Sequence, residues 1–287
     1  MVTPAMTADD IAISHEVMNY DRVRIHRLTV TPPSPWTRLA FFPGYGDHAM
    51  RYLRFFNWMA QRNVACSAID FRGHGVSTGR RGFIRRWDEY LDDVTALLNL
   101  WPAPFVVAHS HGALVVAMAA LRGRLPQINC VFSAPYFKLK IPLNPMIQTL
   151  AQISSRIAPA YHFKSGVRPE ILTRDAELAE ETRRDPLCLG VATPRWFLGA
   201  QRAQNEVVRR AAEFSLPLLM LIPAADQIAD PAVAEDFFRR AASPDKILKI
   251  YPDHQHELFR ELTREKIYED IRQWMLARTP QKTTLAS

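Results

Sequence analysis

Six short apolar runs, separated by segments with helical periodicity, constrain the fold of this chain more than any other feature. Runs that are apolar on both faces are typical of strands buried inside a parallel sheet. Strands that alternate with amphipathic helices indicate an α/β fold, in which helices cover both faces of the sheet. The six predicted strands are residues 38–42, 64–70, 104–109, 128–135, 216–223 and 246–252.

The segments between these runs carry one apolar stripe each, and such stripes predict helices within residues 51–62, 85–101 and 257–276. The alternation stops at residues 136–215, which contain helical patterns and no clear strand. An insertion of that length in a sheet protein is usually functional. We therefore expect an α/β core formed by residues 1–135 and 216–287, with residues 136–215 inserted as a helical cap.

Composition narrows the class of protein. The chain has 287 residues, enough to bury a core without disulfides, and its three cysteines (Cys66, Cys130 and Cys188) are far apart in sequence. This cysteine usage favours a reducing compartment, and the first residues lack the pattern of a secretory signal, so we expect a cytoplasmic protein. The net charge of +7 is spread over scattered arginine pairs, so we expect no nucleic-acid partner.

Two serines compete for the role of a nucleophile. GVSTG, which contains Ser77, matches the Gly-x-Ser-x-Gly pattern of serine hydrolases, whereas AHSHG, around Ser110, has Ala108 in place of the first glycine. The chemistry needs a serine on a sharp turn between a strand and a helix. Ser110 follows the apolar run PFVVAH and precedes GALVVAMAAL, while Ser77 lies in a glycine-rich turn. We therefore favour Ser110 over Ser77, although a serine before a helix is also a common N-cap.

An acid and a histidine follow Ser110 in the order that a triad on such a sheet requires. Asp226 is the first carboxylate after the strand 216–223, and Asp230, one turn further on, is better placed as a helix N-cap. After the last strand the chain offers His254 and His256. We prefer His256, because it lies at the junction with the last helix.

With these motifs, the chain resembles the α/β-hydrolase superfamily, and more closely its monoacylglycerol lipase and lysophospholipase branch. The resemblance implies that residues 136–215 form a helical cap over an acyl pocket and that the turn with Ser77 is structural. Two departures are Pro43-Gly44, where the branch usually has His-Gly, and Ala108 in place of glycine. The supporting stretches are FFPGYGDHAMRY, AIDFRGHGVSTGRRG, VVAHSHGAL, SAPYFKL, PLLMLIPAADQIAD and YPDHQHELFRE, and the resemblance further implies that DPLCLG is a landmark of the cap.

The resulting hypothesis is ester hydrolysis through an acyl-enzyme, with Ser110 as nucleophile, His256 as base and Asp226 as the acid that orients it. The backbone N–H groups of Tyr45 and His111 are the expected oxyanion donors. No cofactor is implied. His48, His74, His109 and His111 lie near these motifs, but they show no paired ligand spacing, so we expect no metal.

The expected substrate is a lipid ester, either a monoacylglycerol or a lysophospholipid. Alternatives are another α/β-hydrolase activity, such as a general carboxylesterase, peptidase or C–C bond hydrolase, and a catalytically silent binding module. Residues 136–215 mix basic side chains with apolar ones such as Met146 and Leu150. This mixture suits peripheral contact with the inner face of a membrane, and equally suits a plain amphipathic lid. The sequence leaves the oligomeric state open.

Overall fold

The computed structural model describes residues 10–141 and 145–279, and all six predicted strands form in it. Two more strands, β1 and β2, precede them as a hairpin that the apolar runs did not predict. The strands of the main sheet are β1 (Ala12–Tyr20), β2 (Val23–Thr31), β3 (Thr37–Phe42), β4 (Val64–Ile69), β5 (Phe105–His109), β6 (Asn129–Ser133), β9 (Leu218–Pro223) and β10 (Lys246–Tyr251).

The main sheet has the strand order β1-β2-β4-β3-β5-β6-β9-β10. The pairs β1–β2 and β2–β4 are antiparallel, and every other neighbouring pair is parallel. Six strands of this sheet therefore point the same way, and their carboxyl ends lie along one edge. They are β4, β3, β5, β6, β9 and β10. Loops at that edge are where open α/β sheets bind ligands.

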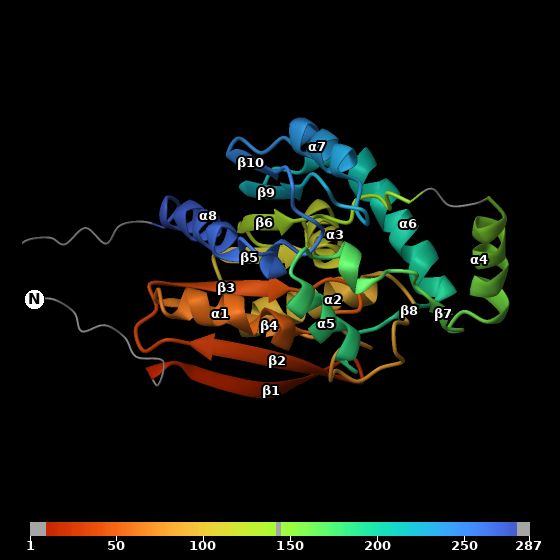
Figure 1. Cartoon of the computed structure of the whole chain (residues 1–287), viewed down its shortest axis with the longest axis horizontal. Coiled ribbons are helices and arrows are strands. Elements are labelled where there is room, and N and C mark those ends of the chain that lie inside the picture. The colour runs from red at the N-terminus through yellow and green to blue at the C-terminus, as the bar shows by residue number, and fades with distance from the viewer. Residues whose placement is uncertain (1–9, 142–144, 280–287) are drawn as a thin grey trace, which may run out of the picture.

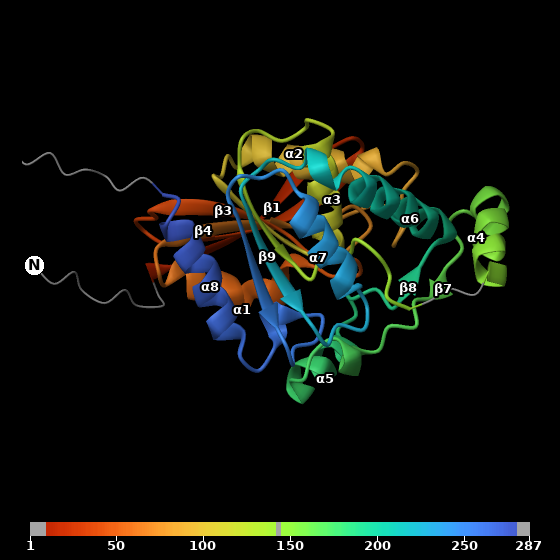
Figure 2. The same cartoon turned by 90° about the horizontal axis from the view of Figure 1, so that it is seen from above.

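Helices cover both faces of the sheet, as the alternation predicts (Figure 2). Successive residues of a strand point to opposite faces, and in β5 Phe105 and Val107 join one core while Val106 and Ala108 join the other. The first core packs against α1 and α8, and the second against α2, α3 and α7. Their bounds are α1 (Leu53–Ala60), α2 (Asp88–Leu100), α3 (His111–Leu121), α7 (Pro231–Arg240) and α8 (Arg264–Leu276).

We call residues 136–215, which lie between β6 and β9, the inserted segment. Its helix α4 stands away from the sheet, while α6 packs alongside α3 (Figure 1). Although the sequence shows no clear strand in this interval, two short strands pair within it. The described elements are α4 (Pro145–Ile157), β7 (Phe163–Lys164), α5 (Ala176–Arg184), β8 (Val191–Ala192) and α6 (Pro194–Arg209).

The end of the chain also differs from the expectation of one helix over residues 257–276. A 3₁₀ turn covers Leu258–Arg260, and α8 begins only at Arg264. The ranges predicted for the core and the insertion include residues 1–9, 142–144 and 280–287, which lie outside the described residues. Within the described part of the chain, no helix has both the length and the apolar character needed to cross a bilayer.

Candidate active site

Ser110 occupies a sharp turn between β5, which ends at His109, and α3, which begins at His111. Its backbone has φ 52° and ψ −114°, a conformation that costs a residue with a side chain about 1–3 kcal/mol. Ser110 holds the N-cap position of α3, yet its side chain makes no capping hydrogen bond. The hydroxyl is therefore available for another partner.

Gly112 explains how α3 can begin so close to the sheet. A Cβ at this position would lie 2.3 Å from the carbonyl oxygen of Phe42 and 2.7 Å from that of Pro43. Only glycine allows the first turn of the helix to approach the end of β3 so closely. A hydrogen bond also holds the backbone of Ser110, because its N–H donates to the carbonyl oxygen of Ser133 at 2.9 Å.

The structure brings Ser110, His256 and Asp226 together in one chain of hydrogen bonds. The distance from Ser110 Oγ to His256 Nε2 is 2.8 Å, and the distance from His256 Nδ1 to Asp226 Oδ2 is 2.7 Å. The second carboxylate oxygen, Asp226 Oδ1, accepts the N–H groups of Ile228 at 2.7 Å and Ala229 at 3.0 Å. All three triad residues are largely buried.

The pKa of His256 reflects two opposing effects. Burial disfavours the charged imidazolium, yet the charge and hydrogen bond of Asp226 outweigh it and raise the pKa of His256 above its usual value, with a smaller contribution from Glu257. An imidazole stabilised in this way accepts a proton from its other neighbour more readily. That neighbour is the Ser110 hydroxyl.

The rejected candidates are engaged elsewhere. Ser77 Oγ donates to the carbonyl oxygen of Asp70 at 2.6 Å and accepts the N–H of His26 at 2.8 Å. His254 Nε2 lies 2.6 Å from Thr263 Oγ1. Asp230 caps α7, and its side chain accepts the N–H of Ala232. Each of these residues therefore has a local structural partner.

The two predicted oxyanion donors flank Ser110. His111 follows it directly in α3, and Tyr45 lies in the loop after β3. In the turns and loops of the described part of the chain, neither N–H donates to a backbone carbonyl. A Cβ on Gly44 would lie 3.3 Å from His109 and 3.5 Å from the Cβ of Ser110, so the absence of a side chain there lets this loop approach the serine.

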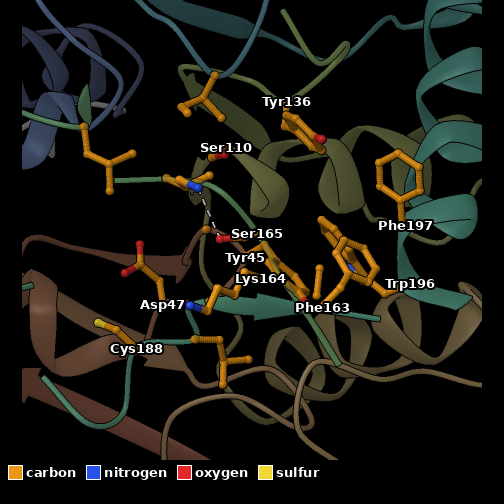
Figure 3. A pocket seen from close by; sticks show the side chains of 18 of the residues that line it. Tyr45, Asp47, Ser110, Tyr136, Phe163, Lys164, Ser165, Cys188, Trp196 and Phe197 are labelled. Carbon is orange, nitrogen blue, oxygen red and sulfur yellow. Dashed lines mark hydrogen bonds between the residues drawn. The ribbon is translucent and has the colours of Figure 1, made fainter. Parts of the chain in front are cut away.

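A cavity of about 880 Å³ opens beside Ser110, between the sheet edge and the inserted segment (Figure 3). Most of its lining is apolar, and three carboxylates and three basic residues, Arg51, Lys164 and Arg183, also border it. Asp47 and Glu257 both pair with Arg51, and Asp185 pairs with His48. Apolar residues of the lining include Tyr136, Leu139, Leu150, Phe163, Leu172, Leu189, Trp196, Phe197 and Ile228.

The buried ion pairs of Arg51 were not predicted from the sequence. Its guanidinium contacts Asp47 and lies 3.0 Å from Glu257 Oε2, next to the triad histidine. The i to i+4 spacing of Asp47 and Arg51 was a readable signal. The pairing with Glu257 was not, because 206 positions separate the two residues.

The histidines near the motifs have different environments. Burial lowers the pKa of His109 and of His111 well below its usual range, so both rings are neutral. In the described part of the chain, one group of side chains could supply three metal ligands. It consists of His48, Asp185 and Cys188, whose possible ligand atoms all lie within 4.8 Å of one another. Burial raises the pKa of the Cys188 thiol to about 11, and a protonated thiol is a poor metal ligand.

Several known proteins are similar to this chain in sequence. A phospholipase of Bacillus subtilis, YtpA, is 28% identical over 209 residues, which cover 71% of this chain and 81% of that protein. A monoacylglycerol lipase of Mycolicibacterium smegmatis is 26% identical over 244 residues, covering 82% and 86%. An uncharacterised abhydrolase domain-containing protein of Dictyostelium discoideum is 24% identical over 91% of this chain, which spans only 29% of its length.

Among solved structures, a soluble variant of monoglyceride lipase from Saccharomyces cerevisiae, in complex with a substrate analog, has a TM-score of 0.83. Its sequence identity is 20%, over 94% of this chain and 96% of that one, so the likeness shows the fold. The family model described as serine aminopeptidase, S33, matches residues 33–263. The chain therefore belongs to the serine aminopeptidase S33 family of the α/β-hydrolase superfamily, within the monoacylglycerol lipase and lysophospholipase branch that its motifs indicated.

Proposed function

We propose that this chain hydrolyses the carboxylic ester of a lipid with one acyl chain, with a monoacylglycerol as the principal substrate. The observation that carries the proposal is the chain of hydrogen bonds from Ser110 through His256 to Asp226, at 2.8 Å and 2.7 Å, beside a largely apolar cavity. The names of the bacterial and yeast relatives support the same substrate class.

In the proposed mechanism, Ser110 Oγ attacks the ester carbonyl while His256 Nε2 takes its proton. Asp226 accepts the hydrogen bond of His256 Nδ1–H and stabilises the imidazolium that forms. The backbone N–H groups of Tyr45 and His111 hold the negative charge that develops on the carbonyl oxygen. His256 then protonates the leaving alcohol, and a water molecule repeats the sequence to release the fatty acid.

We further propose that the inserted segment acts as the cap of an acyl pocket. It supplies much of the apolar lining, including Phe163, Trp196 and Phe197. An alkyl chain buried against such surface gains about 0.8 kcal/mol per methylene. The cavity therefore favours long acyl chains over short ones.

The buried charged groups of the cavity offer little to a charged substrate, so of its basic residues Lys164 is the one that suits a phosphate. Arg51 already pairs with Asp47 and Glu257, which leaves this buried cation with little attraction for a phosphate. The three carboxylates of the lining are likewise paired, whereas an aminopeptidase needs a negative group for the substrate ammonium. A lysophospholipid remains the second candidate, favoured by the resemblance to the Bacillus phospholipase.

Peripheral membrane contact through α4 is a further part of this proposal. Ile153 is 50% exposed and Ile157 is 79% exposed on this helix, which stands away from the sheet (Figure 1). Large apolar side chains at helical spacing, exposed on an amphipathic helix, suit the interface of a lipid bilayer. Such contact would bring the cavity to a substrate dissolved in the membrane.

A substrate panel tests the proposed function. Purified protein is offered monoacylglycerols and lysophosphatidylcholines of increasing acyl length, together with an aminoacyl nitroanilide. We expect release of fatty acid, fastest from long-chain monoacylglycerols, and no release of nitroaniline. Cleavage of the nitroanilide alone would overturn the proposal, and faster hydrolysis of lysophosphatidylcholine would replace the principal substrate with the second candidate.

Two serine variants identify the nucleophile in the same assay. Ser110→Ala should lower kcat by about a millionfold, as loss of a triad nucleophile does in other enzymes, and abolish labelling by a fluorophosphonate. Ser77→Ala is the matched control, because its hydroxyl bonds to the backbone of Asp70 and of His26 and not to a triad residue. Ester hydrolysis that survives in Ser110→Ala but not in Ser77→Ala would reverse the assignment.

A further inference from the structure

The loop that carries Tyr45 is held by a strip of the inserted segment, residues 189–196. The N–H of Leu189 donates to the carbonyl oxygen of Gly46 at 2.8 Å. Gly46 has φ +81°, and a Cβ there would lie 2.9 Å from the carbonyl oxygen of Leu189, so the two backbones are in close contact. The hydroxyl of Tyr45 lies 3.3 Å from the carbonyl oxygen of Val191.

Trp196 adds a ring contact between this strip and the loop. Its ring stacks on the ring of Tyr45, with centroids 3.5 Å apart and planes inclined by 25°. The Tyr45 ring also meets His74 of the core, 4.9 Å away in an edge arrangement. Tyr45 therefore contacts both the core and the inserted segment.

The position of Trp196 is itself fixed. It lies in the first turn of α6, where its N–H is accepted by the hydroxyl of the N-cap residue Thr193. The same hydroxyl donates to the carbonyl oxygen of Gly82 at 2.8 Å, which anchors the start of α6 to a loop of the core. The Trp196 side chain is 6% exposed, so it has little freedom to move independently of the helix.

We propose that Trp196 is a positioning residue that sets the oxyanion hole through Tyr45. The inference rests on the proposed function, in which the backbone N–H of Tyr45 is one of two oxyanion donors. In this arrangement the inserted segment does more than line the acyl cavity. Its strip 189–196 fixes the loop that stabilises the transition state, so the hole is complete only when this strip is docked.

The expected effect follows from the geometry of the hole. Loss of one oxyanion donor lowers kcat by about 10²- to 10³-fold, and a misplacement of about 1 Å costs about 100-fold. Removing the stack leaves the Tyr45 loop attached by its backbone, so we expect a loss of about 10- to 100-fold. Both acylation and deacylation pass through an oxyanion, and kcat falls whichever step limits the rate.

The test compares Trp196→Leu, Trp196→Phe and the wild type on 4-nitrophenyl butyrate, a short soluble ester that depends little on the acyl cavity. We expect kcat to fall in Trp196→Leu with little change in KM, and to stay within about threefold of wild type in Trp196→Phe, which keeps an aromatic partner for Tyr45. A trifluoromethyl ketone, which forms a tetrahedral adduct, should lose affinity for Trp196→Leu in parallel with kcat.

Val207→Ala is the control for a merely structural effect. Val207 is a fully buried residue of the same helix, and it packs in the core away from the cavity. Its truncation should lower stability and leave kcat unchanged. If Trp196→Leu does not fold, Tyr45→Leu removes the other half of the stack, and its kcat should fall by a similar factor.

Each outcome decides the inference. Equal kcat values for Trp196→Leu and wild type, a change confined to KM, or an equal loss of kcat in Val207→Ala would each overturn it. Failure of the proposed function is distinguishable, because the wild type itself would then neither hydrolyse the ester nor react with a fluorophosphonate at Ser110.

Discussion

His256 and its neighbours determine how activity depends on pH. The base must be neutral to take a proton from Ser110, and Asp226 raises the pKa of His256 above the ordinary value of 6.5. A raised pKa keeps the imidazole protonated to higher pH, so activity is present above that pKa and is lost as the pH falls through it. The rings of His109 and His111 do not contribute, because burial lowers their pKa values well below the usual range.

We therefore predict that the acidic limb of the kcat/KM profile of a soluble ester has an apparent pKa above 6.5. Steady-state rates measured from about pH 5 to 9 give this value. In Asp226→Asn the limb should move to lower pH, and kcat should fall by about 10⁴-fold, because the wrong tautomer is held. An acidic limb below 6.5 in the wild type would contradict the assigned role of Asp226.

At the scale of single residues, the sequence predicted the catalytic residues better than the residues that hold them in place. Ser110, Asp226 and His256 could be predicted because each follows a recognisable strand, in a fixed order along the chain. Trp196 and Tyr45 could not be paired in this way, since their contact depends on the path of the inserted segment. Arg51 and Glu257 present the same difficulty, because buried ion pairs leave no local pattern in sequence.

At the scale of elements, five of the six predicted strands are buried on both faces, and the sixth, β10, was recognised by its apolar run although only Tyr251 in it is buried. β4 and β9 are buried at every residue, and their apolar runs were plain. Strand β1 was missed because eight of its nine residues are partly or fully exposed. Strand β2 has six buried residues, but His26, Arg27 and Thr29 interrupt its apolar run. α8 begins late because residues 258–260 form a 3₁₀ turn directly after His256.

The start of α3 yields a prediction about the elbow. A Cβ on Gly112 would lie 2.3 Å from the backbone oxygen of Phe42, so Gly112→Ala must push the helix away from β3. The displacement moves Ser110 and the N–H of His111 together, and we expect kcat to fall by about 100-fold. Ala119→Gly is the control, because it weakens α3 by about 1 kcal/mol without altering the elbow. Equal kcat in the two variants would refute the steric argument.

The exposed face of α4 yields a second prediction at this scale. Ile153→Glu and Ile157→Glu remove apolar surface from a helix that stands away from the sheet. We expect weaker sedimentation with anionic vesicles and slower hydrolysis of vesicle-embedded monoacylglycerol, while hydrolysis of soluble 4-nitrophenyl butyrate is unchanged. Gln152→Glu, on the same helix, adds the same charge without removing apolar surface. If it reduces vesicle binding equally, charge rather than apolar contact explains the effect.

At the scale of the whole molecule, the site is assembled from carboxyl ends of strands that are distant in sequence. Ser110 follows β5, Asp226 follows β9 and His256 follows β10, and 146 positions separate the serine from the histidine. The strand order brings these ends to one edge. The α/β architecture could be predicted because alternation of strands and helices leaves few ways to cover a parallel sheet. The path of the inserted segment follows no comparable rule.

A buried ion network links the three parts of the molecule that meet at the site. Arg51, near the start of α1, contacts Asp47 and Glu257, and its Nη2 donates to Thr182 of α5 at 2.6 Å. Arg260 joins the network, with its Nε 3.3 Å from Glu257. The network thus connects the loop after β3, the inserted segment and the loop that carries His256. Its removal should loosen all three at once.

We predict that Arg51→Leu lowers the free energy of unfolding by about 3–5 kcal/mol, because it leaves the carboxylates of Asp47 and Glu257 buried without their shared partner. Arg54→Ala is the matched control. Arg54 pairs with Glu181 across the same boundary, but the two side chains are 51% and 45% exposed, and such a pair contributes about 0–1 kcal/mol. Urea unfolding at neutral pH measures both variants. A similar small loss in each would mean that burial gives the Arg51 network no greater weight than a surface pair, and that other contacts hold the inserted segment to the core.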